Sequence, residues 1–177
     1  MAKSLKIRNK KLFKALKFLV LFNIFSIPLY IILLTGVSFA PLQFATAQVV
    51  NPLLNAIGIN SRLDGLIISV PEPSGSFAGH ISWDCTGWKS MLAFAALVLA
   101  TDAKRNKKLL GLAMIPLVYA FNIFRVTSVF ALVSVFGAQY FPTIHAIMFS
   151  FAMVAFILLL WVAWLRYVNF KTFRKKN

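Results

Sequence analysis

The sequence has few acidic residues and almost no cysteine. Among its 177 residues, four are aspartate or glutamate, and the single cysteine is Cys85. One cysteine cannot form a disulfide within the chain, and no Cys-x-x-Cys motif or Cys/His pair at ligand spacing indicates a metal site. The sequence therefore predicts no metal and no cofactor.

The chain has few charged residues and many hydrophobic ones. Charged residues make up 13% of the chain and hydrophobic residues 60%, with a mean hydropathy of +0.80. An ordinary soluble domain is about a quarter charged and roughly half apolar. This composition excludes an ordinary soluble domain and favours a membrane protein.

The basic residues are clustered. The formal net charge of +15 would suit a nucleic acid or another anionic surface. However, seven cations lie within residues 1–17, four within 104–108 and four within 171–176. Each cluster adjoins a long apolar run, whereas a nucleic-acid-binding domain spreads its cations over a polar surface. We therefore expect no nucleic-acid partner.

Four apolar runs have lengths near that of a transmembrane helix, which needs about 20 residues. They cover residues 18–35, 86–101, 109–136 and 145–166. With residues 1–17 and 167–177 in the cytoplasm, all three basic clusters lie inside, as the positive-inside rule requires. Trp161, Trp164 and Tyr167 near the last exit suit an interfacial aromatic belt. The sequence predicts one all-α domain in the plasma membrane, a bundle of about four transmembrane helices.

The N-terminal region has an alternative interpretation as a signal peptide. A basic start, an apolar stretch and the small residues Ala45-Thr46-Ala47 resemble the three parts of such a signal. The apolar run is long for a signal peptide, and the small residues lie well beyond its end. We therefore favour an uncleaved helix.

Residues 36–84 would lie outside the cell. Pro41 to Ile57 has apolar residues at helical spacing and is followed by Gly58, which predicts an interfacial or re-entrant helix. Leu66 to Val70 is typical of a strand, Pro71 to Ser76 of a turn, and Ala78 to Trp83 of a returning strand. We expect an amphipathic outer segment and a short β-hairpin.

Two cations, Lys89 and Arg125, fall within the predicted spans. A charged residue there costs about 2.5–3.5 kcal/mol on insertion scales and is a candidate for function. Arg125 lies roughly 24 Å along its helix from Leu109, in the outer half of the bilayer. Asn122 and Ser128 are expected on the same face, pointing into the bundle. The alternative is a structural arginine bound to backbone carbonyls or to an acid.

Cys85 precedes the second span, next to Asp84 and one turn before Lys89. A thiolate is the reactive form of cysteine and is favoured at a helix N-terminus and beside cations. His145 begins the fourth span at similar depth and could serve as general base and acid. His80 is the rival histidine, in the less rigid hairpin. Alternatively, the cysteine is an inert small hydrophobe.

These residues resemble the motifs of a known family. Cys85-Thr86-Gly87-Trp88-Lys89-Ser90 is similar to the cysteine motif of the exosortase/archaeosortase family, and Asn122-Ile123-Phe124-Arg125 to its Asn-x-x-Arg motif. His145 occupies the place of the third family residue, which is His in exosortases and Arg in some archaeosortases. The resemblance covers the chain from about Gly58 to Tyr167.

The resemblance implies an integral-membrane cysteine transpeptidase or protease. Such enzymes cleave C-terminal signals, made of a short motif, a transmembrane helix and a basic tail, on the outer face and pass the protein to a lipid or other envelope acceptor. Cys85 would form a thioester, His145 would be the acid/base, and Arg125 would stabilise the oxyanion or position substrate. The remaining candidates, in substrate-binding or supporting roles, are Asn122, Lys89, Asp84 and Ser128. Larger family members have about eight spans, so this chain would be a minimal core.

Two other functions compete with this interpretation. In a non-catalytic membrane subunit or assembly factor, Arg125 and Asn122 would bind a partner helix and Cys85 would be inert. A small transporter or channel requires a continuous polar stripe, which the inner halves of the second and third runs lack. The recognition motif, the acceptor and the oligomeric state stay open.

Overall fold

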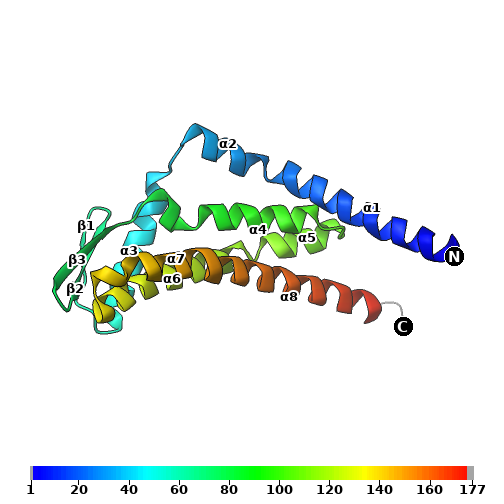
Figure 1. Ribbon diagram of the computed structural model, residues 1–177. Helices are drawn as coiled ribbons and strands as arrows, with labels where there is room; N and C mark the ends of the chain where they lie inside the picture. The colour runs from blue at the N-terminus through cyan, green and yellow to red at the C-terminus, as the bar shows by residue number, and fades with distance from the viewer. Residues whose placement is uncertain (1, 175–177) are drawn as a thin grey trace.

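The computed structural model describes residues 2–174, with side chains for 12–148 and 151–168. The chain is mostly helical, with one small sheet among these residues (Figure 1). In order, the elements are α1 (Ala2–Phe25), α2 (Ile27–Thr35), α3 (Ala40–Ala56), β1 (Arg62–Asp64), β2 (Ile67–Glu72), β3 (Gly75–His80), the 3-10 helix η1 (Trp83–Thr86), α4 (Trp88–Ala100), α5 (Arg105–Leu112), α6 (Ile115–Phe136), the 3-10 helix η2 (Ala138–Tyr140), α7 (Phe141–Ala146), the π-helical segment η3 (Ile147–Ala152) and α8 (Met153–Arg174).

The helices form an elongated bundle whose two ends differ. Figure 1 shows α4, α6 and α8 running alongside one another, with α3 and the sheet at one end. The start of α1 and the end of α8 lie at the other end, as does the turn between α4 and α5. The described parts of the three basic segments therefore gather opposite the sheet. Residue 1 and residues 175–177 of the predicted cytoplasmic ends lie outside the described residues.

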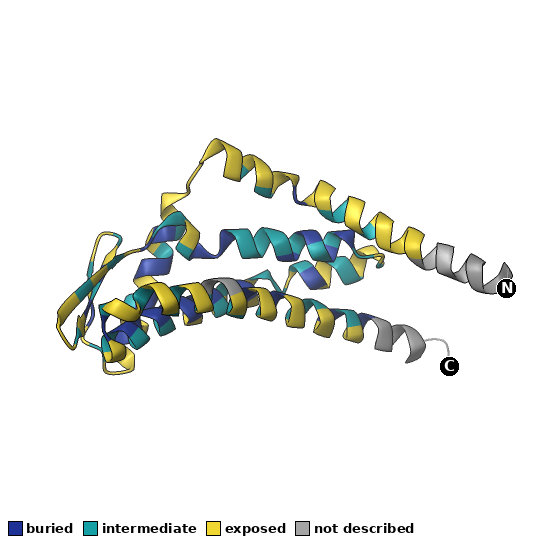
Figure 2. Cartoon of the chain, viewed as in Figure 1, coloured by how far each residue is buried: buried dark blue, intermediate teal, exposed yellow. Residues whose placement is uncertain are grey.

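Within the described residues, two helical segments are long and apolar enough to cross a bilayer, Leu12–Thr35 and Arg105–Phe136. The second and fourth predicted spans are shorter as helices, covering Trp88–Ala100 and Met153–Val168. Only 6% of the most apolar 18-residue stretch of Leu12–Thr35 is buried, and Figure 2 shows α2 and the described part of α1 mostly exposed. Exposed apolar surface of this extent marks a site of contact with a membrane or with another protein.

The segment 36–84, which is predicted to lie outside, contains α3 and a three-stranded antiparallel sheet of order β1-β2-β3. The helix predicted for Pro41 to Ile57 is present as α3, and Gly58 follows it at φ +85. The predicted hairpin is also present, but its turn is reduced to Pro73 and Ser74 because Glu72 pairs with Gly75. The returning strand ends at His80 instead of Trp83, and β1 was not predicted.

Two hydrophobic clusters hold the bundle together, and α6 contributes to both. The outer cluster joins α3, β2 and α6, and its buried residues are Ala47, Val50, Leu54, Ile68, Val70, Ile81, Ile123, Val126 and Phe130. The inner cluster joins α4, α6 and α8, and its buried residues are Phe94, Val98, Val118, Met153, Ile157, Trp164 and Val168. The sheet is therefore packed on the outer end of α6 instead of projecting freely.

Polar contacts fix the chain just before Cys85. The buried Gln43 side chain of α3 donates from Nε2 to the carbonyl oxygen of Ile81 at 3.1 Å. Ser61 Oγ donates to Asn51 Oδ1 at 2.8 Å, which attaches the start of the sheet to α3. These bonds satisfy polar groups that packing against α6 removes from water.

The hairpin tip is attached to the end of α6. The amide of Ala138 donates to Glu72 Oε2 at 3.1 Å, and Ser74 Oγ donates to the same carboxylate. The Ser74 hydroxyl and then the Ala138 amide lower the pKa of Glu72, because both bind its charged form. The stability that this attachment contributes is thus fully present above the ordinary pKa of glutamate. It is lost as the pH falls through the lowered pKa of Glu72.

The turn between η1 and α4 is locked onto α6 by Asn122. Gly87 has φ +75, and a Cβ atom at this position would lie 2.6 Å from Asn122 Cγ. Asn122 is fully buried, and its Nδ2 donates to the carbonyl oxygen of Cys85 at 2.8 Å. The Trp83 and Trp88 rings stack across the turn with centroids 5.3 Å apart. Only glycine combines this backbone conformation with this close approach.

Replacing Gly87 by Ala is expected to destabilise the protein more than Gly58→Ala. Both positions have positive φ, which costs about 1–2 kcal/mol for alanine, but nothing lies within 4 Å of a Cβ at Gly58. The overlap with Asn122 should add about 1–3 kcal/mol for Gly87→Ala. The free energy of unfolding in detergent measures both variants. Equal losses would show that the contact with Asn122 contributes nothing.

Candidate active site

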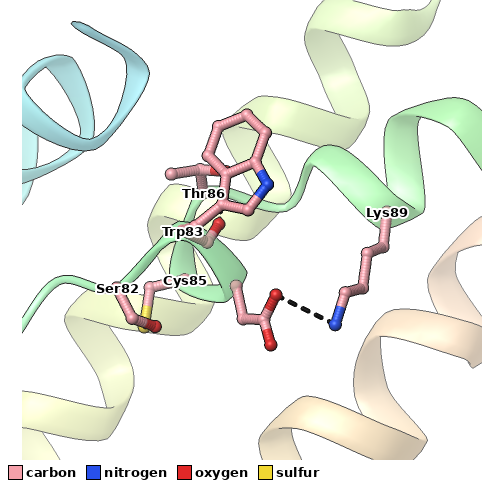
Figure 3. A network of polar contacts seen from close by, with 6 residues as sticks. Ser82, Trp83, Cys85, Thr86 and Lys89 are labelled. Atoms are coloured by element: carbon pink, nitrogen blue, oxygen red, sulfur yellow. Dashed lines mark hydrogen bonds and ion pairs between the residues drawn. The ribbon is translucent and has the colours of Figure 1, made fainter. Parts of the chain in front are cut away.

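Cys85 lies in η1, at the end of the bundle that carries the sheet, and is half-buried. Its backbone amide donates to the carbonyl oxygen of Ser82 at 3.0 Å, which closes the 3-10 turn. The Ser82 hydroxyl lies 3.4 Å from Cys85 Sγ. Figure 3 shows these two side chains together, with Lys89 on the other side of the turn. The serine hydroxyl can therefore stabilise negative charge on the sulfur.

A cavity of about 70 Å³ brings the three principal candidates together. Cys85 from η1, Arg125 from α6 and His145 from α7 all line it. The other lining residues are Gly79, His80, Ile81, Val126, Val129, Phe130 and Phe141. The predicted convergence of a thiol, a guanidinium and an imidazole from three separate segments is thus found in the structure.

Arg125 is the buried charge of this cavity, with 4% of its surface exposed. It lies one helical turn after Asn122, so one stretch of α6 both holds the backbone of Cys85 and presents the cation. No acidic residue is found among the described residues that line the cavity. A buried cation in such surroundings attracts any negative charge that develops nearby.

His145 is held by aromatic packing. Its ring centroid lies 5.3 Å from that of Phe141, and Phe141 packs in turn on Phe77 of the sheet at 5.1 Å. The π-helical segment η3 begins two residues after His145. Such segments are frequent at functional sites. His145 is therefore oriented from both the hairpin and the helix.

His80, the rival histidine, also reaches the cavity. It is the last residue of β3 and is exposed, whereas His145 is half-buried. Both imidazoles can thus approach a substrate at Cys85. The two histidines differ in burial, and the His145 ring is packed on Phe141.

Two supporting candidates do not line the cavity. Gly87 interrupts the helix between Cys85 and Lys89, so helical spacing does not relate these two side chains, and Lys89 Nζ pairs with Asp84 Oδ1 at 2.9 Å. Ser128 does not share the buried face of Asn122 and Arg125. Its hydroxyl donates to the carbonyl oxygen of Phe124, and it lines a groove between α3 and α6. Six residues along a helix is not a whole number of turns.

Sequence reasoning missed Ser82 and Gly79. The Ser-x-x-Cys spacing that closes a 3-10 turn was the available signal for Ser82. A Cβ on Gly79 would lie 2.7 Å from the Phe130 ring, so this glycine shapes the cavity wall. Nothing in the sequence indicated that strand β3 meets α6 there.

The described residues include no group of three or more His, Cys, Asp or Glu side chains that could hold a metal. The groups that converge are a thiol, a hydroxyl, an imidazole and a guanidinium. A thiol, an imidazole and a cation that line one cavity are compatible with acyl transfer.

Comparison with known proteins agrees with these motifs. Residues 5–165 match the family described as transmembrane exosortase. Over 58 residues the chain is 48% identical to archaeosortase A of Haloferax volcanii, a stretch that covers 32% of this chain and 18% of that relative. No solved structure matches the chain. Since the family match extends over most of its length, this chain belongs to the exosortase/archaeosortase family.

Proposed function

We propose that this protein is a membrane-embedded cysteine transpeptidase or protease that cleaves the C-terminal sorting signals of surface proteins. The observation that supports this function is the meeting of Cys85, Arg125 and His145 at one cavity. Membership of a family of transmembrane exosortases makes a membrane-anchored protein the natural substrate. Its signal would comprise a short motif, a transmembrane helix and a basic tail.

In the first half of the reaction, Cys85 Sγ attacks the carbonyl carbon of the scissile peptide bond, and the thiol proton passes to the His145 imidazole. Arg125 stabilises the negative oxygen of the tetrahedral intermediate. The carbon–nitrogen bond then breaks, and His145 returns the proton to the leaving amine. The product is a thioester between Cys85 and the substrate.

In the second half, an amine or a water molecule attacks the thioester carbonyl. His145 accepts the proton of this nucleophile, the carbon–sulfur bond breaks, and the Cys85 sulfur takes up the proton. An amine on a lipid or other envelope acceptor gives transfer, whereas water gives hydrolysis. The choice depends on which acceptor reaches the cavity.

The neighbouring residues take supporting roles in the proposal. Asn122 holds the Cys85 backbone, and Ser82 binds the sulfur. Lys89 and Asp84 form a partly exposed pair outside the cavity, where they would contact substrate that extends beyond the scissile bond. Ser128 is left out because it faces the groove between α3 and α6.

We propose a plasma-membrane protein with four passes, cytoplasmic termini and an active site facing outward. Segments α1–α2 and α5–α6 supply the two long spans. Helix α4, at 13 residues, is roughly 20 Å long at 1.5 Å per residue, short of a bilayer core. The η1 turn extends it at its outer end, and α6 and α8 cover its buried residues. The gathering of the basic segments opposite the sheet supports this orientation.

Cys85→Ala is expected to reduce substrate processing to background. The substrate is a co-expressed envelope protein from the same organism with a short C-terminal motif, an apolar helix and a basic tail, followed by its size and membrane retention. Ser128→Ala is the matched control, since it removes a small polar group outside the cavity. Unchanged processing by Cys85→Ala would favour a non-catalytic subunit.

Substituting His145 should lower the processing rate far more than substituting His80. General acid–base catalysis contributes about 10²–10⁴-fold, so His145→Gln should lower the processing rate by that factor. His80→Gln should lower it by less than about tenfold, because the exposed strand end holds the imidazole loosely. Single-turnover rates measure both variants. The opposite order would assign the acid/base role to His80.

A further inference from the structure

A second polar cavity lies at the end of the bundle opposite Cys85. It has a volume of about 270 Å³, and three segments line it. Helix α1 contributes Lys14, Lys17, Phe18 and Leu21, the end of α4 and the following turn contribute Ala100, Thr101 and Asp102, and α5 contributes Lys108. Nothing in the proposed reaction uses this cavity.

The α1 wall of this cavity is attached to the rest of the bundle. The Phe18 ring packs on Trp161 of α8 with centroids 5.7 Å apart. Trp161 in turn donates from Nε1 to Thr101 Oγ1 at 3.2 Å, at the opposite wall. The lysines of α1 are therefore held near the end of α4.

The charge of the cavity favours an anion. Three ammonium groups and one carboxylate leave it with two positive charges. Lys108 uses one of its three N–H donors on the carbonyl oxygen of Leu99, at 2.6 Å. Lys14 and Lys17 are exposed, so their donors are accessible. Two net positive charges match one phosphate group better than a polyanion.

The apolar part of the lining indicates the source of that phosphate. Phe18 and Leu21 continue the cavity from the lysines along α1, within the segment that is long enough to cross the bilayer. A phosphate held by the lysines would thus have apolar surface on its membrane side. The volume lies just below the roughly 300–1,000 Å³ of pockets that enclose drug-sized ligands, which suits a headgroup.

We propose that this cavity binds the phosphate headgroup of an anionic membrane lipid in the cytoplasmic leaflet. Lys14 and Lys17 contact the phosphate oxygens, Lys108 adds a third cation, and the first methylenes of the acyl chains lie against Phe18 and Leu21. Such a lipid would join α1 to the turn between α4 and α5.

The test uses the purified full-length protein in a neutral detergent, titrated with dioctanoyl phosphatidylglycerol. Lys14→Gln with Lys17→Gln should weaken binding about 30-fold, since each cation near an anionic lipid contributes about 1 kcal/mol. The matched control, Lys104→Gln with Arg105→Gln, removes the same charge at the same end of the bundle from residues that do not line the cavity. It should change the dissociation constant by less than about threefold, within the spread of such contributions.

Three outcomes would overturn the proposal. Equal losses in the two double variants would mean general electrostatic attraction, and equal binding of zwitterionic dioctanoyl phosphatidylcholine would remove the role of charge. Displacement of the lipid by glycerol phosphate at similar concentration would identify a site for free phosphate. Unfolding midpoints without lipid show whether the variants fold. Cys85→Ala should bind the lipid with the affinity of the unmodified protein. A failed lipid-binding test is therefore distinct from a failed test of the catalytic proposal.

Discussion

The contact between Asn122 and the turn that carries Cys85 is the constraint on which the site depends. The Asn122 side chain donates a hydrogen bond to the Cys85 carbonyl oxygen. The same side chain fills the space that a Cβ atom at position 87 would need, so only glycine fits there. One helical turn later, the same helix presents Arg125. Helix α6 therefore both holds the backbone of the nucleophile and carries the cation.

The outer segment completes this arrangement from the other side. Gln43 of α3 fixes the backbone just before η1, and Phe77 of the sheet packs on Phe141, which packs on His145. The outer hydrophobic cluster joins these parts to α6. The small sheet thus forms part of the cavity wall, which explains why a mostly helical membrane protein contains one.

Much of the site could be predicted because membrane topology restricts depth. The sequence predicts similar depths for Cys85, Arg125 and His145 on different helices, and all three line one cavity. The positions of Lys89 and Ser128 could not be predicted from helical spacing. Gly87 breaks the helix before Lys89, and Ser128 is rotated away from Asn122 around α6. The contact of Ser82 depends on a local 3-10 turn, and β1 depends on a tight hairpin in which Asp64 pairs with Ile67; the sequence has only weak signals for both.

The most direct test of the account is whether substrate becomes covalently attached to Cys85. The intact mass of the protein, followed by peptide mapping, is measured in a single turnover with a synthetic sorting-signal peptide, after quenching in acid. The account predicts a hydroxylamine-sensitive adduct on Cys85 whose added mass is that of the N-terminal fragment of the peptide less one water. The adduct should form more slowly when Arg125 is replaced by Gln. Cleavage of the peptide without any adduct on Cys85, under conditions that trap thioesters, would contradict the account.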